Sequence, residues 1–420
     1  MIQVSRFCMA RDVIIAGIDI GSTAIRIAVG QKLAESRLHI IGVAESSSEG
    51  VAKGVVTSID DAVSVLSQCI EKAERLSGVP IDRAYVSIGG NRITVQKSRG
   101  VVAVSKADGE IREDDVDRVI EAAEAVATPP NYEILHVIPR SFTVDGQGGV
   151  KDPVGMTGVR LEVEAQIIHA LSSHVKNITK TVYRTGVDIE DLVLAPLAAA
   201  EAVLTKRQRD LGVVLVLLGG ATTGILVLEE GDVLHTAILP LGSGHITADL
   251  AIGLRTSIDV AERVKVEYGT AIPSDIGKKE EVSWKEVGGS EEGAFSRRQT
   301  AEIIEARLEE LYDFIDKELK KVNRSGLLPA GVVLTGGGAK LSGIVEVAKR
   351  KLRLPATIGK PQGLTTAIEK IHDPAFAVAV GLVLWGKGID DRTPPTLLGR
   401  FSSVGAVTGR MRDWFRSLLP

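Results

Sequence analysis

The chain has 420 residues, of which 44% are apolar, 25% charged and only 4% aromatic. At roughly 100 to 200 residues per folding unit, this length predicts two to four units. The net charge of −4 lacks the basic excess of a non-specific nucleic-acid binder, so nucleic acid is not an expected partner. Two cysteines exclude a disulfide framework and a cysteine-rich metal site, which suits a reducing cytoplasm.

The distribution of apolar and charged residues indicates how the chain could interact with a membrane. The most apolar run, residues 376–386, is shorter than the roughly 18 residues that a membrane span needs. No small-residue cleavage site follows the apolar run at 13–18, so a signal peptide is not expected. Residues 399–420, the tail, carry four Arg and one Asp, a charge of +3 that leaves −7 on the rest. Any function assigned to the chain should account for a basic tail joined to an acidic body.

Two strand-turn-strand patterns occur about 200 residues apart. In residues 12–29, β-branched side chains flank the turn Gly21-Ser22-Thr23, which predicts a β-hairpin. Residues 212–229 repeat the pattern around the turn Gly219-Gly220-Ala221-Thr222-Thr223. The repetition favours two related halves with a nucleotide between them, and two unrelated hairpins are the alternative.

Helices, loops and a linker are expected around the hairpins. Amphipathic patterns at 60–77 and 296–322 predict surface helices packed on a sheet. Residues 278–293 favour a charged surface loop, and residues 386–408 favour a flexible linker. The sequence GLVLWGKG at 381–388 lacks the final Ser or Thr of a P-loop, so a buried helix or strand end is expected there.

Residues 82–185 form a block of different character. It contains a predicted helix at 113–127, stopped by two prolines, a Gly-rich loop at 146–158 and a predicted strand at 160–169. The block therefore resembles an α+β module inserted into the surrounding fold.

Three glycine clusters are candidates for nucleotide contacts. Asp19, at the end of the first strand, would hold Mg²⁺ through water, and the turn that follows offers backbone N–H groups and hydroxyls to phosphates. The second turn can contact the same phosphates from the other side. The third cluster, Gly336-Gly337-Gly338, lets a base or ribose lie close to the backbone. Each cluster alone is as often a plain turn, but the three together favour a nucleotide site.

These residues resemble the actin/Hsp70/hexokinase ATPase superfamily and, within it, the FtsA family of bacterial cell-division proteins. The two hairpins and VVLTGGGAKLSG carry the superfamily resemblance. The family resemblance rests on HVIPRSFTVDGQGGVKDPVGMTGVRLEVE, LPLGSGHITADLAIGLRTSIDVAERVKVEYG and SRRQTAEIIEARLEEL. It covers nearly the whole chain and implies an α/β, actin-like ATPase fold of two RNase H-like halves with a family-type inserted α+β subdomain.

The resemblance also implies a division into subdomains and two further nucleotide contacts. The expected parts are subdomain 1A at 12–84, 171–206 and 372–387; the SHS2-like subdomain 1C at 85–170; 2A at 207–248 and 330–371; 2B at 249–329; a linker at 388–408; and a membrane-targeting helix at 409–420. Gly242 joins the expected nucleotide-binding residues. Glu262 and Lys265 would reach the ribose, with an i,i+3 surface salt bridge as the alternative.

Several residues depart from the pattern of the superfamily. Leu217 and Gly224 replace two Asp residues of the second hairpin, Ala221 replaces its central Gly, and Ser243 replaces another Gly. Ala195 stands where hydrolysing relatives place a Glu. Leucine offers no acceptor to a metal ion or an attacking water. We therefore expect binding of ATP and Mg²⁺ with slow or absent hydrolysis.

The tail has the pattern of a short amphipathic helix. At 100° per residue its large apolar side chains fall within an arc of about 140°. A membrane surface is the expected partner, and docking on the protein's own core is the alternative. The expected membrane-binding residues are Arg410, Met411, Arg412, Trp414, Phe415, Arg416, Leu418 and Leu419.

The resemblance implies an ATP-binding protein that polymerises on the cytoplasmic face of the inner membrane at the division site and anchors FtsZ there through the tail. Further implied partners are other copies of the chain, anionic lipids and downstream divisome proteins. By the same analogy, residues 249–329 are the expected FtsZ-binding part. The alternatives are a small-molecule kinase or a pilus-assembly-type ATPase on the same fold. The missing acidic residues count against a kinase.

Overall fold

The computed structural model describes residues 13–33, 38–105, 108–125, 128–289, 292–390 and 402–403. The predicted tail helix at 409–420 and most of the predicted linker lie outside the described residues.

The first half of the molecule is built on a five-stranded sheet with the strand order β11-β6-β1-β2-β3. The strands are β1 Val13–Ile20, β2 Ala24–Lys32, β3 Leu38–Ser47, β6 Arg83–Ile88 and β11 Asp188–Leu194. β1 and β2 are antiparallel, which confirms the first predicted hairpin, while β1, β6 and β11 run parallel. Helices α1 (Ile59–Ser77) and α3 (Ser172–Tyr183) pack together near β3 and β11, and helices α4 (Ala195–Val203) and α10 (Ala377–Asp390) pack together against β1 and β6.

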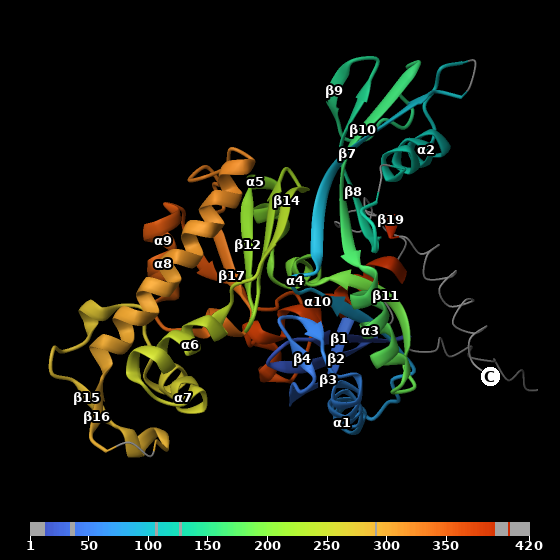
Figure 1. The fold of residues 1–420 in the computed structure, drawn as a ribbon. Helices are drawn as coiled ribbons and strands as arrows, with labels where there is room; N and C mark the ends of the chain where they lie inside the picture. The colour runs from blue at the N-terminus through green and yellow to red at the C-terminus, as the bar shows by residue number, and fades with distance from the viewer. Residues whose placement is uncertain are drawn as a thin grey trace, which may run out of the picture.

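The second half repeats this arrangement with the strand order β14-β13-β12-β17-β18 (Figure 1). The strands are β12 Val213–Leu218, β13 Thr223–Glu229, β14 Asp232–Leu239, β17 Val332–Thr335 and β18 Ala356–Ile358. β12 and β13 are antiparallel and β12 and β17 parallel, so the second predicted hairpin is also confirmed. The two sheets thus share one strand order, as expected for two related halves. The main helices of the second half are α6 Ser243–Leu254, α8 Arg297–Lys321 and α9 Ile344–Leu352.

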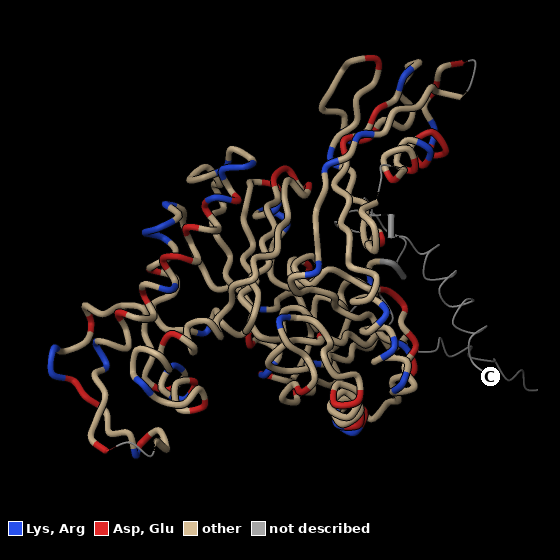
Figure 2. The backbone as a smooth tube through the Cα atoms, in the orientation of Figure 1, with Lys and Arg blue, Asp and Glu red and all other residues tan. Residues whose placement is uncertain are grey.

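The inserted block forms a sheet of its own, which projects from the two halves in Figure 1. Its elements are β7 Ile93–Ala103, α2 Glu113–Glu124, β8 Tyr132–Val144, β9 Gln147–Val150 and β10 Arg160–Leu171, and β19 (Ser402–Ser403) pairs with β8. Helix α2 packs on this sheet at Gly100, where a Cβ would lie 2.0 Å from the Val119 carbonyl oxygen. Acidic residues gather in the first turn of α2 (Figure 2), where they complement the helix dipole. The expected loop at 146–158 was partly wrong, because β9 pairs with β8 there.

The outer part of the second half corrects another expectation. Residues 278–293 do not form a plain surface loop, because β15 (Glu281–Ser283) pairs with β16 (Ala294–Ser296). Val282, Trp284 and Phe295 are buried together against α7 (Ile258–Tyr268). Charged residues separate these apolar residues in the sequence, so the sequence did not predict this small hydrophobic core.

The remaining short elements connect the larger ones. They are β4 Val51–Ala52, β5 Val55–Val56, α5 Lys206–Leu211 and the 3₁₀ turns Pro273–Asp275, Trp284–Val287, Gly337–Lys340, Glu369–His372 and Pro374–Phe376. The sequence GLVLWGKG lies within the buried helix α10, as predicted. Across the described residues, no helix combines the length and the apolar character that a membrane span requires.

The burial of Asp191 predicts that the stability of the folded protein depends on pH. Asp191 lies half-buried on β11 and accepts a hydrogen bond from Trp385 Nε1 at 3.2 Å. Burial raises the pKa of Asp191 to about 6, although this hydrogen bond and one from a backbone N–H lower it. The folded state therefore binds an extra proton between about pH 4 and 6, and stability falls as the pH rises through this window.

Replacing Asp191 with Asn removes the charge and keeps an acceptor for Trp385. The variant Asp191→Asn is expected to be more stable than the unaltered protein by about 1 to 2 kcal/mol at pH 7.5, and equally stable at pH 4. Thermal unfolding of both proteins at the two pH values measures this difference. An equal gain at pH 4 and pH 7.5 would rule out titration of Asp191 as its cause.

Candidate functional site

The two hairpin turns line one cavity of about 670 Å³ between the halves. The first turn is closed by Gly21 N–H donating to Ala24 O at 3.1 Å, and the second by Gly219 N–H donating to Thr222 O at 3.0 Å. The turns touch, because a Cβ on Gly220 would lie 2.4 Å from Thr23 Cγ2. Of the residues predicted for the two turns, all but Thr223 line the cavity: Gly21, Ser22, Thr23, Gly219, Gly220, Ala221 and Thr222.

Asp19 lines the cavity at the end of β1. Its Oδ1 accepts a hydrogen bond from Ser87 Oγ at 2.7 Å, and Ser87 Oγ accepts one from Ile20 N–H at 3.2 Å. Burial raises the pKa of Asp19, against the opposing effects of Ser87 and Arg26. A cation bound near this carboxylate would favour its ionised form. Ser87 was missed from the sequence because β6 joins β1 only in the folded sheet.

A third segment supports the first turn. Gly54 N–H donates to Ser22 Oγ at 2.7 Å. Gly54 has φ +72°, and a Cβ there would lie 2.5 Å from the Cα of Gly90, so no side chain fits between the two backbones. His174 Nε2 lies 2.9 Å from the Gly89 carbonyl oxygen, and this hydrogen bond holds the loop that contains Gly89 and Gly90. These glycines line the cavity but stand in no motif that the sequence would reveal.

The N-terminus of α6 is fastened to the second turn. Ser243 N–H donates to Gly219 O at 2.9 Å, and Gly244 N–H donates to Gly220 O at 2.7 Å. Gly242 does not line the cavity but permits this close approach, since its Cβ would lie 2.7 Å from backbone atoms of the turn. Thr223 is fully buried and donates to Leu241 O at 2.6 Å. Gly242 and Thr223 are thus placed to shape the turn rather than to touch a ligand.

The third glycine cluster also lines the cavity, beside the end of β12 and the start of α6. Gly336 has φ +90° and its N–H donates to Pro374 O at 3.1 Å. A Cβ on Gly338 would lie 2.5 Å from Leu218 Cγ, whereas a Cβ on Gly337 would meet no atom within 4 Å. This part of the cavity wall is therefore open backbone, against which a flat ring can lie.

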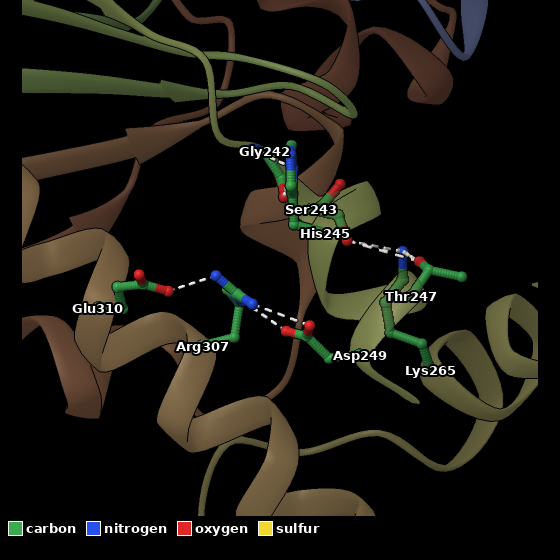
Figure 3. A network of polar contacts seen from close by, with 8 residues as sticks. All are labelled: Gly242, Ser243, His245, Thr247, Asp249, Lys265, Arg307 and Glu310. Atoms are coloured by element: carbon green, nitrogen blue, oxygen red, sulfur yellow. Dashed lines mark hydrogen bonds and ion pairs between the residues drawn. The ribbon is translucent and has the colours of Figure 1, made fainter. Parts of the chain in front are cut away.

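Glu262 and Lys265 on α7 both line the cavity and join α6 to α7. Lys265 Nζ lies 2.7 Å from Glu262 Oε2. Lys265 Nζ also donates to Thr247 Oγ1 of α6 at 2.8 Å (Figure 3). The i,i+3 salt bridge expected as the alternative is therefore present, with Lys265 only 9% exposed and the Glu262 side chain 50% exposed at the cavity. Behind it, Asp249 of α6 binds Arg307 of α8, which ties both helices together.

Further charged residues of the cavity were missed from the sequence. Arg26 on β2 pairs with Glu45 at 2.7 Å, and its buried Nε finds no hydrogen-bond partner among the residues that the structure describes. Lys340 pairs with Asp373 at 2.7 Å. All four line the cavity, so two cations lie within reach of an anionic ligand. Arg26 follows the first turn by three residues, and this spacing was the available signal.

The departures from the superfamily pattern lie on the cavity wall. Leu217, at the end of β12, and Ala195, at the start of α4, are both lining residues. Among the described residues, no three His, Cys, Asp or Glu side chains are clustered to hold a metal ion. A metal ion here would therefore take most of its ligands from a bound phosphate and water, with Asp19 beside it. The expected membrane-binding residues 410–419 lie outside the described residues.

Comparison with known proteins identifies the family. The family model described as "Cell division protein FtsA" matches residues 214–381, and the model "SHS2 domain inserted in FTSA" matches residues 90–169. The cell division protein FtsA of Pseudomonas aeruginosa is 36% identical over 372 residues, which cover 89% of each chain. That of Bacillus subtilis is 38% identical over 366 residues, which cover 87% of this chain and 82% of the relative. The chain belongs to the FtsA family of cell division proteins.

Solved structures confirm the fold expected for this family. The PilM-PilN type IV pilus biogenesis complex has a TM-score of 0.65 at 16% identity and covers 89% of this chain and 98% of its own. MreB5 of Spiroplasma citri bound to ADP has a TM-score of 0.54 at 11% identity and covers 90% of this chain and 98% of its own. The fold is actin-like, with an SHS2 domain inserted into the first half.

Proposed function

We propose that the cavity binds ATP with Mg²⁺. The observation that carries this proposal is the pair of turns from the two halves whose residues line one cavity, because backbone N–H groups and hydroxyls of such turns suit phosphate oxygens. A volume of about 670 Å³ suits a nucleotide, and the open backbone at Gly337 leaves room for its base. The similar MreB5 of Spiroplasma citri was solved with ADP.

The predicted residues that line the cavity have separate roles in this proposal. The two turns bind the phosphates, and Asp19 holds Mg²⁺ through water. Glu262 and Lys265 contact the ribose, for which the carboxylate can accept and the ammonium can donate a hydrogen bond. Arg26 adds a positive charge beside the phosphates.

Hydrolysis of the bound ATP is expected to be slow or absent. Leu217 and Ala195 place apolar atoms where a carboxylate would orient an attacking water. Nucleotide would then act as a ligand that sets the conformation of the protein. Phosphate release at a chaperone-like rate from nucleotide-saturated protein would contradict this part of the proposal.

The variant Asp19→Asn tests the nucleotide site. It retains an acceptor for Ser87 but loses the charge that attracts Mg²⁺. We expect its affinity for ATP in the presence of Mg²⁺ to be about tenfold lower, a loss of about 1.4 kcal/mol, and its affinity without Mg²⁺ to be unchanged or higher. Calorimetric titration with and without Mg²⁺ measures both values.

The pH dependence of binding supplies a second readout on Asp19. Because burial raises the pKa of Asp19, protonation competes with Mg²⁺ at a higher pH than for an ordinary carboxyl group. Affinity of the unaltered protein for Mg²⁺-ATP should therefore begin to fall on acidification at a higher pH than an ordinary carboxyl group would give. The Asn variant should lack this fall, and parallel pH profiles of the two proteins would argue against Asp19 as the metal-binding group.

We further propose that the protein polymerises on the cytoplasmic face of the inner membrane at the division site and anchors FtsZ there. If the tail forms the expected helix, one tail would contribute roughly 1.5 to 3 kcal/mol per buried large apolar side chain at most, and about 1 kcal/mol per Arg near anionic lipid. A polymer joins many such weak anchors into one stable attachment. Residues 249–329 are the proposed contact to FtsZ, and downstream divisome proteins would bind the assembled polymer.

Removal of the tail is expected to abolish membrane binding. Full-length protein should pellet with vesicles that contain anionic lipid, and a chain that ends at Gly405 should stay in the supernatant. The variant Trp414→Glu, which keeps the length of the tail but places a charge among its apolar residues, should behave like the shortened chain. Equal pelleting of all three proteins would exclude the tail as the anchor. Pelleting with vesicles that lack anionic lipid measures how much of the membrane binding depends on the charge of the arginines.

A further inference from the structure

The inserted sheet contacts both halves of the molecule, although the chain joins it only to the first half (Figure 1). On that side His136 of β8 accepts a hydrogen bond from Leu194 N–H at 3.0 Å, and its ring lies 6.0 Å from the ring of Trp385. On the other side β7 and β8 contact β14 of the second half. The inserted subdomain therefore bridges the halves that enclose the cavity.

Two side chains of the inserted block form hydrogen bonds to the second half. Gln166 of β10 is 3% exposed, and its Nε2 donates to Val233 O at 3.1 Å. Lys151 donates to Glu230 O at 2.8 Å and lies 3.1 Å from the Glu230 carboxylate and 3.5 Å from that of Asp232. These four residues, Gln166 and Lys151 with their partners Glu230 and Val233, are called the clasp.

Strand β13 connects the clasp to the cavity. Its seven residues span about 20 Å, with the second turn at one end and Glu230 directly after the other. β13 is paired with β12 and β14 along its length, so it moves as part of a rigid sheet. A movement of the second turn away from the first must therefore displace Glu230 and Val233 relative to the inserted sheet.

Breaking the clasp has an energetic cost. Opening would exchange the hydrogen bond between the Gln166 amide and the Val233 carbonyl for hydrogen bonds to water, and it would separate Lys151 from two carboxylates. The structure shows the clasp closed while the two turns are in contact. The clasp and the closed cavity thus belong to one conformation.

We propose that the clasp links closure of the cavity over its nucleotide to the seating of the inserted subdomain on the second half. The inference rests on the proposed binding of nucleotide to the cavity. By thermodynamic reciprocity, bound nucleotide stabilises the seated inserted subdomain, and a ligand that unseats this subdomain weakens nucleotide binding. The inserted subdomain is then both a sensor and an effector of the nucleotide site.

The test compares Mg²⁺-ATP affinity of full-length variants by calorimetric titration. Gln166→Leu should bind about tenfold more weakly, because the donor to Val233 O is lost and the closed form is disfavoured. Glu164→Ala on the same strand is the matched control. The Glu164 side chain is 62% exposed, and its carboxylate makes only a distant ion pair, at 3.9 Å, with the guanidinium of Arg140. The control should bind like the unaltered protein.

A charge exchange supplies a second test that does not depend on the buried glutamine. Lys151→Glu faces Glu230 and Asp232 with a like charge and should weaken binding about threefold. Adding Glu230→Lys should restore most of the affinity. A role of Lys151 in stability alone would not predict this rescue of nucleotide affinity.

Hydrogen exchange separates coupling from mere stabilisation. Mg²⁺-ATP should slow amide exchange at 230–235 in the unaltered protein and should slow it much less in Gln166→Leu. The inference is overturned if the unaltered protein binds Mg²⁺-ATP and the clasp variants bind it equally well, while the proposed nucleotide site stands. If the unaltered protein binds no nucleotide, the proposed function and this inference both fail. If Gln166→Leu does not fold, the charge exchange decides.

Discussion

Gly242→Ala is expected to lower the affinity for Mg²⁺-ATP by about 10- to 100-fold, although Gly242 does not line the cavity. An added Cβ would lie 2.7 Å from three backbone atoms, Gly219 O, Gly220 O and Thr222 N. No side-chain rotation relieves a contact with backbone, so α6 must move away from the second turn. Overpacking of this kind costs about 1 to 3 kcal/mol, and here it acts on the geometry of the turn.

The expected result is specific to the site rather than to the fold. Separation of α6 from the turn would break the hydrogen bonds that Ser243 and Gly244 donate to it, at 2.9 and 2.7 Å. Gly277→Ala makes the same chemical change in the same half, where the nearest atom is 3.9 Å away, and should leave affinity unchanged. Calorimetric titration of both variants decides. Normal binding by Gly242→Ala would show that α6 does not position the turn for nucleotide.

The sequence predicted the parts of the site whose residues are contiguous. Each hairpin carries its own strands and turn, so the β-branched pattern around Gly21 and around Gly220 was enough to place both. The glycines at 336–338 were recognised for the same reason, since they follow a buried strand directly. Such local patterns depend only on neighbouring residues and on the alternation of a strand.

The residues that the sequence did not reveal reach the cavity from other segments. Ser87 meets Asp19 only because β6 pairs in parallel with β1, and Gly54 meets Gly90 only across two loops. The small core around Trp284 was missed because its apolar residues are separated by charged ones. Long-range pairing leaves no periodic signal in one chain, so these contacts became visible only in the folded structure.

Gly381→Val is expected to destabilise the first half more than any other change considered for this chain. Gly381 lies in α10 where that helix crosses α4, and a Cβ there would lie 1.8 Å from the Ala198 carbonyl oxygen. On the other side of α10, a Cβ on Gly17 of β1 would lie 2.3 Å from Ala379 O. The helix is therefore held between two backbones and cannot move away from one without meeting the other.

The strain should unfold the protein at a lower temperature. A loss of about 3 kcal/mol, the upper end of the usual cost of overpacking, lowers the melting temperature by about 6 to 12 °C. Gly148→Ala, where the nearest atom is Thr143 Oγ1 at 3.5 Å, is a control for substitution of a glycine and should melt like the unaltered protein. Because the conflict is with a backbone oxygen, adding Ala198→Gly should not rescue Gly381→Val. Rescue by that second change would mean that the side chain of Ala198 sets the spacing of the two helices.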